Sequence, residues 1–148
     1  MLNKRSRYAI KALVQIARAN ALENPASVAS IVEQTTIPQK FLEAILSDLK
    51  VGGFVTSKKG SAGGYFLAKS PDQINLAELI RVMNGPIAMV SCVSLNYYEP
   101  CEYCMDEKTC GIHAVMEEVR DASLAILNKT TIASIIQREE KLTKPKKK

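Results

Sequence analysis

The amino-acid sequence predicts a mainly α-helical fold with one small β-hairpin. Apolar residues recur at helical spacing through most of the chain, and two short β-prone runs flank a glycine-rich turn near residues 60–64. Proline and glycine break this pattern at short intervals, which separates the predicted elements. With 148 residues, 47% of them hydrophobic, the chain is large enough for one compact domain with an appendage.

Three helices are predicted in the first 51 residues. The first covers residues 4–21, and the second covers residues 26–34 with Ser27 as a capping residue. The third begins near Pro38, because the N–H that proline lacks is not needed in the first turn of a helix, and it ends before Gly52-Gly53. Its predicted buried stripe is Phe41, Leu42, Ile45, Leu46 and Leu49.

The hairpin is predicted next, with strands at 54–57 and 65–68 around a basic turn. Three helices with a tight second turn, followed by a hairpin, describe a winged helix-turn-helix, in which the third helix lies in a DNA major groove. Polar residues of that helix could then reach base edges, and a cationic hairpin tip could approach phosphates. The residues predicted to contact DNA are Thr36, Gln39, Lys40, Glu43, Lys58 and Lys59.

Charge is distributed unevenly along the chain. Residues 1–69 hold ten Lys or Arg against four Asp or Glu, whereas residues 70–140 hold five against eleven. A basic first half predicts that this half faces a polyanion such as DNA. Residues 141–148, with five lysines and no acid, are interpreted as a solvated tail.

Several classes of protein are excluded by what the sequence lacks. No apolar run approaches the roughly 18 residues of a membrane span, and no secretory signal pattern follows the first basic residues. These two observations predict a cytoplasmic protein, in which the cysteines are expected to be reduced. The glycine-rich turn leads into a strand and does not match a nucleotide-binding loop. No catalytic constellation is recognisable, and the C-x2-C pair lacks the βαβ context of a thiol oxidoreductase, so we expect no enzyme.

All four cysteines fall within a predicted loop, residues 91–112, that follows a linker at 71–90 with a helix at 76–83. Cys92, Cys101, Cys104 and Cys110 are spaced C-x8-C-x2-C-x5-C, and the one histidine, His113, follows closely. Clustered thiolates select soft metal centres, which favours an iron–sulfur cluster and leaves zinc, a metal-free thiol or disulfide switch, and idle cysteines as alternatives. His113 is interpreted either as a ligand or as a helix-surface residue.

A long helix is predicted over residues 111–127, and a shorter helix is predicted after Thr131. Residues 113–140, which include most of both helices, are the predicted dimerisation region. The long helix has an apolar stripe and a polar side that includes Glu117, Arg120 and Asp121. Pairing with the same helix of a second chain would bury the stripe and suit a palindromic DNA site; the alternative is packing on the chain's own winged domain at 1–70. The apolar stripe is Ile112, Val115, Met116, Val119, Ala122, Ile126 and Leu127.

The sequence resembles the IscR-type (Rrf-two) family of bacterial dimeric winged-helix regulators over residues 1–138. The resemblance rests on three sequence runs, at residues 7–13, 37–43 and 60–67. Cys92, Cys104, Cys110 and His113 then follow in the order that the family shows. The resemblance implies a cytoplasmic DNA-binding homodimer and adds Arg7, Ser61, Gly63 and Tyr65 to the expected DNA-binding residues. Some members hold a cluster and others, such as the cysteine-metabolism repressor, do not.

In family members that hold a cluster, the resemblance implies that Cys92, Cys104 and Cys110 are ligands, with a variable fourth ligand. In some members the fourth ligand is a residue of the first helix, but none of the corresponding positions here is a suitable ligand. Cys101, an extra thiol, would complete four-cysteine ligation of a [4Fe–4S] cluster, whereas His113 would suit a [2Fe–2S] cluster. We therefore expect a repressor or activator gated by cluster chemistry; a protein-interaction module without a sensor is the alternative.

Overall fold

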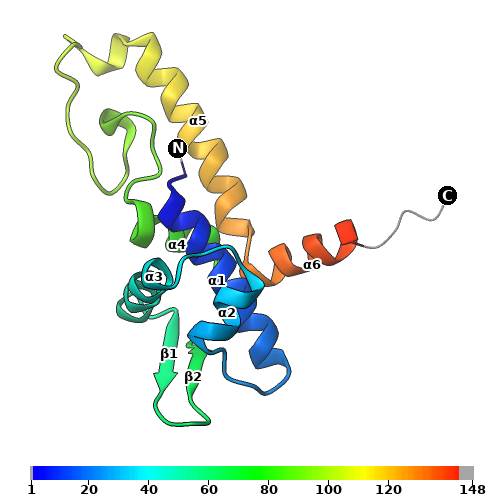
Figure 1. Ribbon diagram of the computed structural model, residues 1–148. Coiled ribbons are helices and arrows are strands. Elements are labelled where there is room, and N and C mark those ends of the chain that lie inside the picture. Colours follow the sequence, from blue (N-terminus) through cyan, green and yellow to red (C-terminus); the bar gives the residue numbers. More distant parts are fainter. Residues whose placement is uncertain (1, 144–148) are drawn as a thin grey trace.

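A computed structural model describes residues 2–143 (Figure 1). The elements are α1 (Lys4–Ala21), α2 (Val28–Gln34), α3 (Gln39–Val51), β1 (Val55–Lys58), β2 (Gly64–Leu67), α4 (Leu76–Asn84), the short 3-10 helices η1 (Ser91–Val93) and η2 (Glu107–Thr109), α5 (Gly111–Lys129) and α6 (Ile132–Thr143). This architecture confirms the predicted mainly helical fold with one hairpin. Of the expected lysine-rich tail, residues 144–148 lie outside the described residues. None of the helices described is long and apolar enough to cross a bilayer.

The winged head is built on α1, which the other elements of the head surround. Ala9, Leu13 and Ile16 on α1 are fully buried, as are Leu42 and Leu46 on α3, so the two helices share one core. Polar side chains start the first two helices: Asn3 accepts a hydrogen bond from the Ser6 N–H, and Ser27 accepts one from the Ser30 N–H. An ion pair between Arg5 and Asp48 links α1 to α3 at the surface.

The hairpin is anchored to the head on both of its strands. β1 and β2 pair antiparallel from Val55 opposite Leu67 to Lys58 opposite Gly64. Ala26 and Tyr65 exchange two backbone hydrogen bonds of 2.8 and 3.0 Å, which fix β2 to the connection between α1 and α2. On the other side, the Lys50 ammonium donates to the Ser57 hydroxyl over 2.6 Å, which links β1 to α3. The wing therefore has a fixed position beside α3 (Figure 1).

Two of the last three helices, α4 and α6, pack on the head, and α5 extends from it as an arm. Asn75 caps α4, and Asn75 and Thr131 form an isolated β-bridge that places the start of α6 beside the start of α4. Ile132 is fully buried in the main core, and Arg18 on α1 pairs with Glu139 on α6 at 2.8 Å. The helix after Thr131 thus packs on the first helix of its own chain, whereas α5 extends away from the head (Figure 1).

Two expectations about side-chain burial were wrong. Phe41, assigned to the buried stripe of the third helix, is 54% exposed, because that stripe consists of Leu42, Ile45, Leu46 and Leu49 and Phe41 lies one position before it. Arg120, assigned to the polar side of the long helix, is 9% exposed and is the one charged side chain among the buried residues described. It lies inward because its guanidinium donates to the carbonyl oxygen of Val93 in the cysteine loop.

Candidate metal centre and nucleic-acid interface

The cysteine-rich loop lies at the end of α5 that is far from the wing. It leaves the head after α4, forms η1 and η2, and joins the first turn of α5 (Figure 1). All four cysteines are free thiols; Cys92 on η1 is buried, and Cys101, Cys104 and Cys110 are half-buried. The two 3-10 helices of the loop contact α5, and Cys110 directly precedes its first residue.

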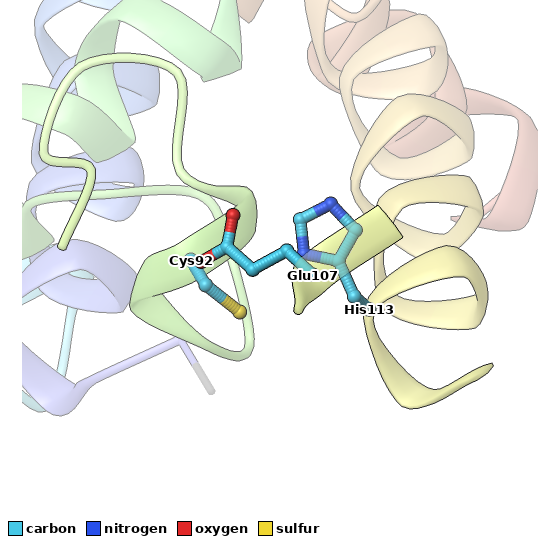
Figure 2. Close-up of side chains that lie close together, drawn as sticks. All are labelled: Cys92, Glu107 and His113. Carbon is cyan, nitrogen blue, oxygen red and sulfur yellow. The ribbon is translucent and has the colours of Figure 1, made fainter. Parts of the chain in front are cut away.

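Three side chains of different chemistry converge within this loop. The Cys92 thiol, the Glu107 carboxylate and the His113 imidazole come from η1, η2 and α5, and their ligand atoms lie within 4.8 Å of one another (Figure 2). The Nδ1 atom of His113 is buried and has no hydrogen-bond partner among the described residues. Sequence reasoning included Cys92 and His113 but missed Glu107, whose one signal was its place in the cysteine-rich segment.

The surroundings of Cys92 and Glu107 explain their electrostatics. Burial raises the pKa of the Cys92 thiol, and negative charge on Cys101 and Glu107 raises it further. Tyr98 donates its hydroxyl to the Glu107 carboxylate, with both oxygens at 3.1 Å, and this hydrogen bond raises the pKa of Tyr98. The carboxylate is thereby oriented by a neighbour from the same loop.

Cys104 and Cys110 form a second group. Cys110 is the N-cap of α5, and the N–H of His113 donates to its sulfur over 3.4 Å. That N–H and a hydrogen bond from the Cys104 thiol lower the pKa of Cys110, as is usual for a thiol at a helix N-terminus. Burial and the same hydrogen bond raise the pKa of Cys104. Cys101 stays outside this pair and lines a surface hollow together with Cys92.

Arg120 ties the cysteine loop to the middle of α5. Its Nη1 donates to the carbonyl oxygen of Val93, the residue after Cys92, over 2.7 Å. Its Nε and Nη2 donate to the carboxylates of Asp121 and Glu117 over 2.8 and 3.2 Å, and the hydrogen bond from Arg120 lowers the pKa of Asp121. A buried guanidinium needs such partners, which explains why this arginine lies inward. Arg120 therefore joins η1 to α5 at Val93, the residue next to the candidate ligand Cys92.

Most of the expected DNA-contacting residues lie on α3 and the neighbouring wing, whereas Arg7 lies on α1 and Thr36 lies in the turn before α3. Arg7, Thr36, Gln39, Lys40, Glu43, Lys58, Lys59 and Ser61 are exposed, whereas Gly63 and Tyr65 are half-buried. The Gln39 amide donates to the Glu43 carboxylate over 2.9 Å, so these two side chains form one polar unit on the exposed side of α3. A Cβ at Gly63 would collide with the Lys58 carbonyl oxygen, so the packing of the hairpin turn requires glycine at this position.

A three-helix head with a hairpin wing, joined to a long helix that carries a thiol-rich loop, defines a winged helix-turn-helix regulator. The chain belongs to the Rrf2 family, described as iron-dependent transcriptional regulators, whose sequence pattern its residues 2–138 match. The predicted family resemblance is thereby confirmed.

Individual relatives agree with this assignment. An rrf2-like HTH-type transcriptional regulator of Rhodobacter capsulatus is 36% identical over 138 residues, which are 92% of each chain. The HTH-type transcriptional regulator IscR of Cronobacter sakazakii is 28% identical over 141 residues, 95% of this chain and 83% of that one. The structure of CymR, the global cysteine regulator of B. subtilis, superposes with a TM-score of 0.76 at 28% identity, covering 93% and 97% of the two chains. These relatives are transcriptional regulators and not enzymes.

Proposed function

We propose that this regulator is a homodimer whose affinity for a palindromic operator is set by an iron–sulfur cluster in the loop at 91–112. The observation that carries the proposal is the direct connection between the thiol-rich loop and α5 through Arg120 and Val93. The proposed units are the DNA-binding head at 1–70, the linker at 71–90, the sensor loop at 91–112 and the dimerisation helices at 113–140.

Dimerisation through α5 is supported by its exposed apolar side chains. Ile112 is 70% exposed, Val115 53% and Ile126 65%, which is unusual for an amphipathic helix that has found all its packing partners. An apolar groove between α4 and α5 includes Ile87 and Val119 and continues this surface. A second copy on this face would bury these side chains and present two copies of α3 to successive major grooves.

Binding of DNA is assigned to α3 and the wing. Gln39 and Glu43 stand on the exposed side of α3, where they can meet base edges in a major groove. Lys58 and Lys59 are exposed on the wing and can neutralise phosphates beside that groove. Their anchoring to the core gives the two contact regions a fixed spacing.

The donor set fits an iron–sulfur cluster. The loop holds four free thiols, and the first turn of α5 adds an imidazole nitrogen that is buried and has no hydrogen-bond partner among residues 2–143. Soft thiolates are the ligands that iron–sulfur clusters require. We propose Cys92, Cys104 and Cys110 as ligands, with Cys101 or His113 as the fourth. A bound cluster would supply sensitivity to oxygen, nitric oxide or iron shortage. The protein's part is to hold η1 and the start of α5 at the spacing that the ligands dictate.

A metal-free thiol switch is a second candidate function. The closeness of Cys104 to Cys110 favours it, because two neighbouring thiols, one with a lowered pKa, suit disulfide formation. Hydrogen peroxide would oxidise the two thiols to one disulfide and be reduced to two waters. The similarity to CymR, a cysteine regulator, is in line with this reading. Zinc in the same loop is a further alternative.

Replacing both Lys58 and Lys59 with alanine is expected to weaken binding to every DNA sequence. If both lysines contact phosphate, the slope of log K against log salt falls by about 1 to 2. Gln39→Ala is the contrast: it should relax base preference and leave the salt slope unchanged. Fluorescence anisotropy with matched and mismatched operators at several salt concentrations measures both quantities. An unchanged slope in the double variant would mean that the wing does not touch DNA.

Protein purified without oxygen is expected to be coloured and to contain iron and inorganic sulfide. Cys104→Ser and Cys110→Ser should each abolish the visible absorbance, because each removes a ligand. Cys101→Ala and His113→Ala separate the two candidate fourth ligands: the variant that loses the cluster identifies the residue that holds it. Colourless anaerobic protein whose operator affinity responds to peroxide only while Cys104 and Cys110 are present would establish the thiol switch instead.

A further inference from the structure

We propose that Cys92, Glu107 and His113 form a binding site for one borderline divalent metal ion, such as Fe²⁺ or Zn²⁺, in chains that carry no cluster. The site is distinct from the Cys104–Cys110 pair. The existence of this site is argued from its geometry alone, and only its role in sensing rests on the function proposed above.

The geometry of the three ligand atoms supports a single ion. The Cys92 sulfur, a Glu107 oxygen and a His113 nitrogen lie within 4.8 Å of one another and come from three separate elements (Figure 2). Tetrahedral ligands about 2.0–2.3 Å from a zinc ion lie about 3.3–3.8 Å apart, so small side-chain rotations would close the set. A thiolate and a carboxylate also carry the two negative charges that balance a divalent cation.

A second observation points to a ligand at this place. Nδ1 of His113 is buried and makes no hydrogen bond within residues 2–143, although buried imidazole nitrogens normally have a partner. Coordination of an ion between His113, Cys92 and Glu107 would supply the missing partner. The mixed nitrogen, oxygen and sulfur donors suit a borderline cation better than an all-thiolate cluster.

The supporting shell is already in position. Tyr98 donates its hydroxyl to the Glu107 carboxylate, and Asp106 caps η2 by accepting the Lys108 N–H over 3.0 Å. Arg120 holds the carbonyl of Val93, next to Cys92. Metal ligands are commonly oriented by such second contacts, which limit the rearrangement that binding requires.

Cys104 lies beside Cys110, and Cys110 accepts the N–H of His113 in the first turn of α5. A single ion at Cys92, Glu107 and His113 therefore does not need them, whereas a cluster does. This difference makes the ion site and the cluster experimentally separable.

The test is an anaerobic titration of the full-length, cluster-free protein with Co²⁺ alone. Binding is read from the sulfur-to-cobalt charge-transfer band and the visible bands of tetrahedral cobalt. We expect one Co²⁺ per chain in the wild type and in the Cys104→Ser, Cys110→Ser double variant. Glu107→Gln and His113→Gln should each weaken binding by at least about tenfold, since each removes a ligand atom. Glu102→Gln, an exposed acid of the same loop, is the matched control and should bind as the wild type does.

Three outcomes would overturn the site: no cobalt binding in the wild type, unchanged affinity in Glu107→Gln, or loss of binding in the double cysteine variant. Circular dichroism of each variant shows that it is folded, and a folded His113→Gln protein tests the site even where Glu107→Gln is unstable. Cluster reconstitution is measured on the same samples. Glu107→Gln protein that takes up a cluster but binds cobalt like the wild type refutes the ion site and leaves the proposed function intact.

Discussion

Phe54→Ala is expected to lower the free energy of unfolding by about 3–5 kcal/mol. Phe54 is fully buried in the main core, three residues after the end of α3. Its N–H donates to Leu49 over 2.9 Å and its carbonyl accepts from the Ala68 N–H over 2.9 Å, so the residue joins the end of α3 to the wing. The ring packs so closely that a Cβ added at Gly52 would lie 3.1 Å from it. Removing the ring leaves a cavity where helix and wing meet.

Phe41→Ala provides the matched control, because it deletes the same ring from a residue that is 54% exposed. We expect a change in unfolding free energy of less than about 1 kcal/mol. Urea denaturation at one fixed protein concentration measures both variants, since the stability of a dimer depends on concentration. Equal losses in the two variants would contradict the assignment of Phe54 to the core and of Phe41 to the surface.

The contrast between these two phenylalanines indicates what the sequence could and could not reveal. Helical spacing located α1, α3 and α4 to within a few residues, because a repeating apolar stripe and polar caps such as Asn75 are local signals. The same spacing could not tell that Phe41 lies just outside the stripe. A helix advances about 100° per residue, so a one-position error moves a side chain from the core to the surface.

The candidate site was foreseeable only in part, for a different reason. Cysteine spacing located the loop and its thiols, since all four cysteines and His113 are close in sequence. The spacing did not predict which of these side chains lie together in space. His113 lies close to Cys92 and Glu107, whereas Cys110 lies close to Cys104. Such groupings depend on how η1, η2 and α5 pack together, and no spacing rule relates residues of three separate elements.

Arg120 shows the same limit and leads to a mechanical interpretation of sensing. Helical periodicity assigns it to the polar side of α5, and its partners there, Glu117 and Asp121, are indeed exposed. The residue is buried because its guanidinium turns under the loop to reach the Val93 carbonyl. A change in the position of η1 would therefore be transmitted to the helix proposed to pair with a second chain.

Arg120→Gln is expected to uncouple the loop from DNA binding without removing the candidate ligands. Allosteric coupling between two sites typically changes affinity about 5- to 150-fold. For the wild type, we expect the operator affinities of cluster-loaded and cluster-free protein to differ by a factor in that range. In Arg120→Gln the ratio should approach one, because the shorter amide cannot hold Val93, Asp121 and Glu117 together. Iron and sulfide content should stay at the wild-type level, which separates lost coupling from a lost cluster.

Lys129→Gln is the matched control for this variant. Lys129 is an exposed cation in the last turn of the same helix, and its replacement removes an equal charge from α5. Operator affinity of both loading states is measured by anisotropy at one salt concentration, so that the change in net charge affects both variants alike. We expect Lys129→Gln to retain the full affinity ratio. A full ratio in Arg120→Gln as well would show that the signal from the loop reaches the DNA-binding heads by contacts other than the Arg120–Val93 hydrogen bond.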